Sequence, residues 1–171
     1  VPTAANRTPD AFVKLLWHTQ YSMVDGLVKV PDLMQAVAAA DMPAVALSDA
    51  GNLFAMVKFY TRALREGIKP IIGVEISMRD EDQVSGEPTL MVLLCMDVDG
   101  YRNLTRLVTR AFQEGQRKGR PEVSRGWLTP SACEGLIALS GGFEGELAHL
   151  AQSSDPSPVA AALQHWCSVF P

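Results

Sequence analysis

The stretch Ala44–Ile76 reads AVALSDAGNLFAMVKFYTRALREGIKPIIGVEI and contains two short apolar runs separated by a helical pattern. The runs Ala44–Leu47 and Pro70–Ile76 have the length and apolar character of buried strands. Between them, apolar side chains recur at helical spacing, at Leu53, Met56, Val57, Tyr60 and Leu64. Asn52 is placed to cap this helix and Gly67 to end it. The stretch therefore predicts a strand–helix–strand unit whose two strands run parallel.

The same alternation continues on both sides of this unit. Before it, Phe12–Trp17 is a strand-length run, and a helix opens at Pro31, in the first turn, where a missing N–H costs nothing. After it, we expect strands and helices over Leu90–Met96, Tyr101–Phe112, Leu136–Leu139, Glu144–Ala151 and Val159–Val169. The polar segments Arg79–Glu87 and Gly115–Gly126 are expected to be loops. This order of elements predicts an α/β sheet or barrel.

The composition is that of a globular protein of one domain. Of its 171 residues, 47% are apolar and 20% charged, which argues against disorder. A net charge of -4 disfavours a module that binds nucleic acid by itself. Cys95, Cys133 and Cys167 lack CxxC spacing and are expected to be reduced thiols, which favours a cytoplasmic protein. The apolar runs are too short to cross a membrane, and residues 1–11 are expected to form a flexible arm.

Polar residues accompany the ends of several predicted strands. His18 follows the first strand, Asp25 the turn after it, Asp49 follows the second strand, and Glu75 lies in the third. Because functional residues of parallel α/β folds gather at the carboxyl ends of strands, these four side chains are expected to face one rim. A histidine with several carboxylates is a donor set that a divalent metal accepts. Simpler interpretations stay open, since Asp25 before Gly26 is typical of a turn, Asp49 of a helix start, and His18 of a structural histidine.

The segment Arg102–Arg125 concentrates positive charge. It holds seven Arg and Lys residues against two Glu, which gives +5 within a chain of net charge -4. Arg102, Arg106 and Arg110 are spaced by four and therefore line one helix face. One interpretation is a solvated face. The other is a patch for a phosphate backbone or an acidic partner, with the candidates Arg106, Arg110, Arg117, Lys118 and Arg120.

Five motifs follow one another along the chain, namely Phe12–Gly26, Met42–Leu53, Gly67–Glu75, Gly100–Leu104 and Gly135–Gly142. Together they resemble the PHP (polymerase and histidinol phosphatase) domain of bacterial DNA polymerase III alpha subunits. The resemblance implies a distorted β/α (TIM-like) barrel over residues 12–171. The chain stops after a helical pattern, where a parallel fold calls for another strand, so we expect this barrel to be truncated before its last strands.

For family members with an intact site, the resemblance implies a metal-dependent phosphoesterase with up to nine ligands. Of these ligand positions, His18, Asp25 and Glu75 keep a donor, and Asp49 keeps the acidic half of an Asp-His pair. The other positions within this sequence carry no donor and hold Leu16, Ala50, Leu90 and Gly142. Because a divalent ion needs about four to six donors, we expect no catalytic residue, no metal and no other cofactor for this region.

Loss of these ligands resembles the alpha subunits of proteobacteria, which rely on a separate proofreading exonuclease. The resemblance implies a non-catalytic scaffold that docks the exonuclease subunit and contacts the remaining polymerase domains of the same chain. DNA polymerisation and its Mg²⁺ would belong to a palm domain outside this sequence, and DNA would bind the whole assembly. Two alternatives stay open: an active phosphoesterase or 3′→5′ exonuclease, and a nucleic-acid-binding module that uses the basic segment.

Overall fold

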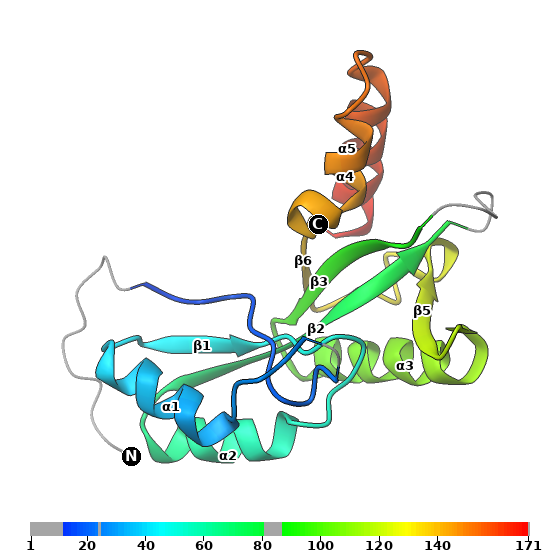
Figure 1. Cartoon of the computed structure of the whole chain (residues 1–171). Coiled ribbons are helices and arrows are strands. Elements are labelled where there is room, and N and C mark those ends of the chain that lie inside the picture. The colour runs from blue at the N-terminus through cyan, green and yellow to red at the C-terminus, as the bar shows by residue number, and fades with distance from the viewer. Residues whose placement is uncertain (1–11, 24, 81–86, 171) are drawn as a thin grey trace.

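A six-stranded mixed sheet lies at the centre of the structure, a computed structural model that describes residues 12–23, 25–80 and 87–170 (Figure 1). The strands follow the order β4-β5-β2-β3-β6, and β1 pairs with β2 outside that path. Their bounds are β1 Ala44–Leu47, β2 Lys69–Arg79, β3 Thr89–Cys95, β4 Gln116–Arg117, β5 Arg120–Ser124 and β6 Leu136–Leu139. The predicted α/β class is confirmed, and the expected arm at residues 1–11 lies outside the described residues.

The unit predicted at Ala44–Ile76 is present. β1 and β2 run parallel, with Ala44 opposite Lys69, and α2 (Met56–Arg65) connects them. The helix begins four residues after Asn52, which does not cap it. Instead, the Asn52 side chain donates to the backbone oxygens of Tyr21 and Ala50 and accepts the N–H of Phe54, so it shapes the loop before the helix.

The expectation of parallel strands throughout is wrong for the middle of the sheet. β2 pairs with β3 antiparallel, and β3 with β6 antiparallel, whereas β2 and β5 are parallel. The reason is the length of the connection between β2 and β3, residues 80–88. A parallel crossover needs a dozen or more residues and usually a helix, so a connection this short returns the chain as an antiparallel strand.

Three helices pack against one face of the sheet, namely α1 (Val30–Ala39), α2 and α3 (Val98–Glu114) (Figure 1). On β2, alternate residues Val74, Ile76 and Met78 point toward α3 and form the larger core cluster. α3 begins where the Asp97 side chain accepts the N–H of Gly100 at 2.8 Å, a capping interaction that satisfies a free amide of the first turn. The opposite face of the sheet carries Glu75 and a smaller apolar cluster, Ala46, Val92 and Leu94 with Ile71 and Leu139.

Two segments differ from their sequence prediction. Phe12–Trp17 runs beside β1 through one bridge, between Lys14 and Val45, without becoming a strand. The predicted loop Gly115–Gly126 contains the hairpin β4–β5, with Lys118 and Gly119 at its tip in the left-handed region (φ 49° and 79°). A two-residue turn with both φ values positive matches the twist of a hairpin, and its lysine–glycine sequence is a weaker signal than asparagine–glycine.

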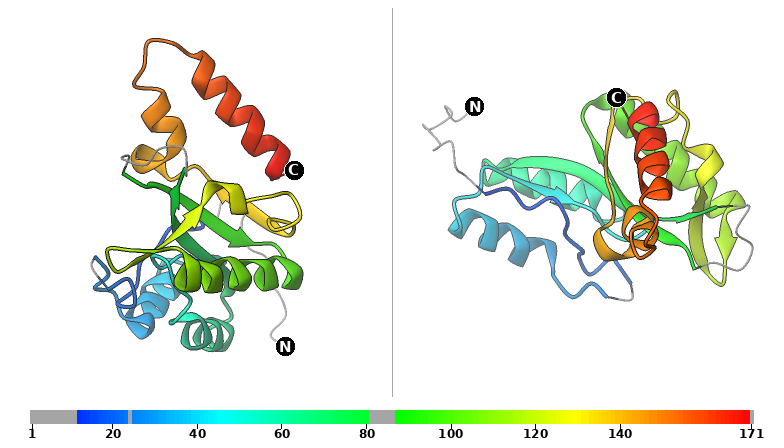
Figure 2. Two further views of the ribbon diagram at one scale, coloured as in Figure 1. Left: turned by 90° about the vertical axis from the view of Figure 1, so that its right-hand side faces the viewer. Right: turned by 90° about the horizontal axis from the view of Figure 1, so that it is seen from above.

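The last two helices, α4 (Glu146–Leu150) and α5 (Ser157–Val169), lie side by side and project from the sheet beyond β6 (Figures 1 and 2). Glu146 joins them to the rest of the domain. It accepts the indole N–H of Trp166 at 2.6 Å and lies 3.4 Å from Arg125, which also stacks on the Trp166 ring. Within the described part of the chain, no helix has the length and apolar character needed to cross a bilayer.

Candidate functional site

The loop Trp17–Gly26 holds the first two candidate residues and is fastened to the sheet by its backbone. The N–H of Trp17 donates to the Ser48 hydroxyl at 2.8 Å, and the N–H of Ser48 donates to the Trp17 carbonyl at 3.2 Å. At the other end, Gly26 lies so close to Thr19 that an added Cβ would stand 1.7 Å from the Thr19 carbonyl oxygen. Glycine is therefore required at position 26, and the tight return of the chain carries Asp25 back to His18.

Asp49, at the end of β1, binds this loop from below. Its carboxylate accepts the Thr19 N–H at 2.6 Å, the Thr19 hydroxyl at 2.8 Å and the Ser22 hydroxyl at 2.8 Å. The Ser22 hydroxyl in turn accepts the N–H of Ala50 at 3.0 Å. Asp49, Thr19 and Ser22 are fully buried. Three donors around one buried carboxylate meet the requirement that a buried charge be hydrogen-bonded, so Asp49 fixes the loop.

His18 lies between two carboxylates. Its Nδ1 is 2.9 Å from Asp25 Oδ2, and its Nε2 is 3.1 Å from Glu75 Oε2. The Glu75 side chain is mostly buried on β2, whereas that of Asp25 is 59% exposed. The contact with Glu75 and the contact with Asp25 raise the pKa of His18 to about 9, against the opposing effect of burial. At neutral pH the ring is therefore an imidazolium, a positive charge held between two negative ones.

Two of the four positions that carry no donor, Ala50 and Leu90, lie beside the strand that holds Glu75. Ala50 forms a bridge with Glu75, and Leu16 precedes His18 by two residues. Leu90 is on the same face of β3 as Val92, the residue opposite Glu75. Gly141 lies against the Leu90 carbonyl, so that Gly142 follows at the same edge. An added Cβ at Gly142 would meet no atom within 4 Å, so the site has room for a ligand there but no donor.

Sequence reasoning selected His18, Asp25 and Glu75, which the structure brings into contact, and Asp49, which it places beneath them in a separate network. Across the described ranges, no three His, Cys, Asp or Glu side chains are arranged so that they could hold a metal ion. Thr19 and Ser22 were not anticipated as partners of Asp49. In the sequence, only the polarity of Thr19 and Ser22 next to His18 indicated a role for them. Their contacts with Asp49 join residues about 30 positions apart, and helix or strand periodicity cannot predict contacts at that separation.

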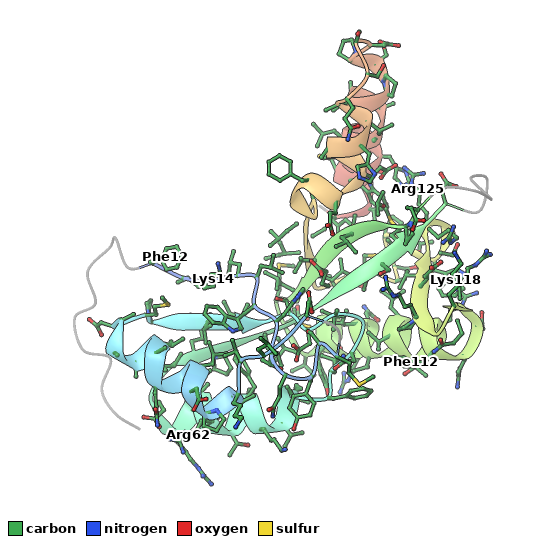
Figure 3. The ribbon with its side chains drawn as sticks, in the orientation of Figure 1. Phe12, Lys14, Arg62, Phe112, Lys118 and Arg125 are labelled. Carbon is green, nitrogen blue, oxygen red and sulfur yellow. The ribbon has the colours of Figure 1, made fainter. Side chains whose placement is uncertain are left out.

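The basic segment divides into paired and unpaired residues. Arg110 donates to Glu114 at 2.8 Å and stacks on Trp127 at 4.1 Å, and Arg106 donates to the side-chain oxygen of Asn103 at 3.1 Å. Arg102 likewise pairs with Asp99. The hairpin β4–β5 carries the remaining candidates. Arg117 lies 3.9 Å from Glu122, which Arg79 already binds, while Lys118 and Arg120 are exposed with no ion pair in the part of the chain that the structure describes (Figure 3).

The fold is that of an α/β domain in which His18 lies between the carboxylates of Asp25 and Glu75. The chain belongs to the PHP domain family, which matches residues 15–171. It is similar to the DNA polymerase III subunit alpha of three bacteria. It is 46% identical over 163 residues to the Pseudomonas aeruginosa protein, 40% over 159 residues to that of Vibrio cholerae, and 42% over 136 residues to that of Escherichia coli strain K12.

These matches cover 94%, 93% and 80% of this chain but only 14%, 14% and 12% of the respective relatives, so the chain spans a small part of their length. Among solved structures, an amidohydrolase from Chromobacterium violaceum is 21% identical with a TM-score of 0.46. That likeness covers 59% of this chain and 33% of the other.

Proposed function

We propose that this chain is the PHP module of a replicative DNA polymerase of the DNA polymerase III alpha type and that the module itself is not catalytic. Its similarity to the alpha subunits of three bacteria supports the first part. The arrangement of His18 between Asp25 and Glu75, with hydrocarbon at the neighbouring ligand positions, is the single observation that carries the second.

The proposal rests on the number of available donors. A divalent ion takes about four to six, and a phosphoesterase centre with two or three ions takes more. The carboxylate of Asp49 already accepts three hydrogen bonds from within the domain. Both ring nitrogens of His18 face carboxylates. The residues present therefore do not fit a hydrolytic metal cluster.

By resemblance to proteobacterial alpha subunits, we propose that the module supports the remaining polymerase domains of its parent chain and docks the proofreading exonuclease subunit in the cytoplasm. Polymerisation, with Mg²⁺ and DNA, would belong to those other domains.

The decisive test is isothermal calorimetry with Mn²⁺ and Zn²⁺, together with hydrolysis of p-nitrophenyl phosphate and of single-stranded DNA. We expect no stoichiometric binding of two ions and no hydrolysis above that of a His18→Ala control. Tight binding of two or more ions, or hydrolysis that disappears in His18→Ala, would establish the active phosphoesterase or exonuclease instead. For the docking role, the full-length parent protein should co-elute with the exonuclease subunit of the same genome, and deletion of this region should abolish co-elution.

A second candidate function, nucleic-acid binding, is favoured by one observation: the hairpin tip presents Arg117, Lys118 and Arg120 to solvent. Such binding would weaken steeply with salt, because each phosphate contact releases counterions. Replacing the three residues with Ala should then reduce the salt dependence of DNA binding. An unchanged affinity would eliminate this candidate.

A further inference from the structure

The outward side of α2 carries an apolar stripe that the core does not use. The helix packs on the domain through Phe59 and Ala63, which are fully buried. Its other side exposes Val57 (68%), Tyr60 (45%) and Leu64 (54%), spaced by three and four residues and hence aligned along the helix. Folding of the described residues gains little from large side chains this exposed, so their alignment points to a contact with something beyond these residues.

Val57 and Tyr60 of this stripe form one wall of a groove of about 600 Å³, and Leu64 continues the stripe beyond it. The opposite wall is the junction between β3 and α3, where Met96 and Val98 are also mostly exposed, and Ile72 lies between the walls. Two further exposed rings, Phe54 and Phe112, have centroids 6.3 Å apart. An exposed apolar surface of this kind marks a protein interaction site.

A second groove, of about 510 Å³, runs along the other flank of α2, between it and α1. It is lined by four cations, Lys29, Lys58, Arg62 and Arg65, and by no acidic side chain among the described residues. Arg62 pairs with Glu66 at 3.1 Å, and Lys58 donates to the neutral hydroxyl of Tyr21 at 2.6 Å. The flank therefore keeps a net positive charge.

The two grooves share Val57 and Thr61, so α2 is a ridge with an apolar flank and a basic flank. Arg62 on this ridge and Phe112 on α3 both lie on the side of the molecule away from α4 and α5, as their labels in Figure 3 show. Side chains on a helix form ridges that fit the grooves of another helix, and an apolar stripe with spacing of three and four matches the same spacing on a partner.

We propose that α2 is the docking ridge for an acidic amphipathic helix of a partner protein. The apolar stripe of that helix fills the groove beside Val57 and Tyr60, and its flanking carboxylates face Lys29 and Arg65. Charge complementarity selects this occupant over a basic helix, and the apolar groove selects it over a nucleic acid, whose phosphates would use the basic flank alone. The proposal stands whether or not the partner is the exonuclease.

The test measures binding of synthetic peptides of about 18 residues, roughly five helical turns, to the full chain by fluorescence anisotropy. One peptide has a leucine stripe flanked by Glu, the second has the same stripe flanked by Lys, and the third has the Glu flanks with the leucines scrambled. We expect the first to bind at least about tenfold more tightly than either of the others, a difference of about 1.4 kcal/mol.

Two variants test separately what the apolar flank and the basic flank of α2 contribute to binding. Val57→Asp should weaken the Glu-flanked peptide by about tenfold or more, and Arg65→Glu should remove the preference for Glu over Lys flanks. The matched controls are Leu163→Asp, an exposed apolar position on α5, and Lys118→Glu on the hairpin, neither of which should change the affinity. Thermal unfolding monitored by circular dichroism confirms that each variant is folded.

Equal affinity for the three peptides, or an unchanged affinity in Val57→Asp, would overturn the proposal. So would a dimer in sedimentation equilibrium that Val57→Asp dissociates, because the occupant would then be a second copy. Salt-sensitive binding of single-stranded DNA that Arg65→Glu abolishes would also overturn it. None of these outcomes depends on the metal and hydrolysis measurements that test the proposed function.

Discussion

Asp49 and the pair Asp25 and Glu75 are held by different partners. Asp49 is fully buried and is stabilised by neutral donors, two hydroxyls and one backbone N–H. The cluster of Asp25 and Glu75 is stabilised instead by the positive charge of His18. The hydrogen bonds to Asp49 come from donors that do not titrate near neutral pH, whereas the attraction between His18 and its two carboxylates depends on the proton of the imidazole. The comparison shows that these residues belong to two separate networks, one of hydrogen bonds around Asp49 and one of charges around His18.

The largest effect is expected from Asp49→Asn. The amide keeps one oxygen for the Thr19 N–H and the Ser22 hydroxyl, but it places an N–H₂ against the Thr19 hydroxyl and removes the charge that strengthens all three hydrogen bonds, so we expect a loss of about 3 kcal/mol in the free energy of unfolding. Urea denaturation measures it. The matched control is Asp99→Asn, an exposed residue paired with Arg102, for which we expect less than about 0.5 kcal/mol. Equal effects of the two substitutions would contradict the role of Asp49 as the anchor of the loop.

The next expected effect is a pH dependence of the free energy of unfolding that arises from the His18 cluster. Because the pKa of His18 is raised from 6.5 to about 9, the folded state binds the proton more tightly than the unfolded state. The stability that this proton contributes is complete below pH 6.5 and is lost as the pH rises to about 9, and solvent screening keeps it below about 3 kcal/mol. Urea denaturation across this range should show the decline in the wild type and a flatter profile in His18→Gln. A profile that is identical in the two proteins would refute the ionic cluster.

A smaller effect separates the two carboxylates of the cluster. Glu75 is mostly buried and contributes most to the raised pKa of His18, whereas Asp25 is largely exposed and screened by solvent. Glu75→Gln should therefore lower the pKa of His18 further than Asp25→Asn does. NMR titration of the imidazole ring measures both, and the reverse order would show that solvent exposure does not control the coupling.

The smallest effect is expected on the hairpin. Lys118→Ala and Arg120→Ala remove exposed charges without ion pairs among the described residues, so the free energy of unfolding should change by less than about 0.5 kcal/mol. Thermal or urea unfolding measures it. A larger loss would mean that the hairpin charges contribute to folding and would weaken their interpretation as a binding surface.

Local sequence patterns predicted the bounds of a strand correctly where the strand is a buried and uninterrupted apolar run. The predicted bounds of Ala44–Leu47 and Leu136–Leu139 are those of β1 and β6, because uninterrupted apolar runs have few alternatives to a central strand. The patterns failed at Phe12–Trp17, where β1 offers only one bridge, and at the hairpin β4–β5, whose polar residues lack the alternation of a half-buried strand.

The sequence by itself determined the α/β class, the residues that remain at the rim and the family resemblance, since these depend on periodicity and on residue identity. Only the tertiary structure decided what each rim residue does. The partners of Asp49 lie about 30 residues away in the chain, and the two carboxylates around His18 come from a loop and a strand separated by 50 residues (75 - 25). Protonation of His18 and saturation of Asp49 arise from contacts between distant segments, and these contacts exist only after the sheet has formed.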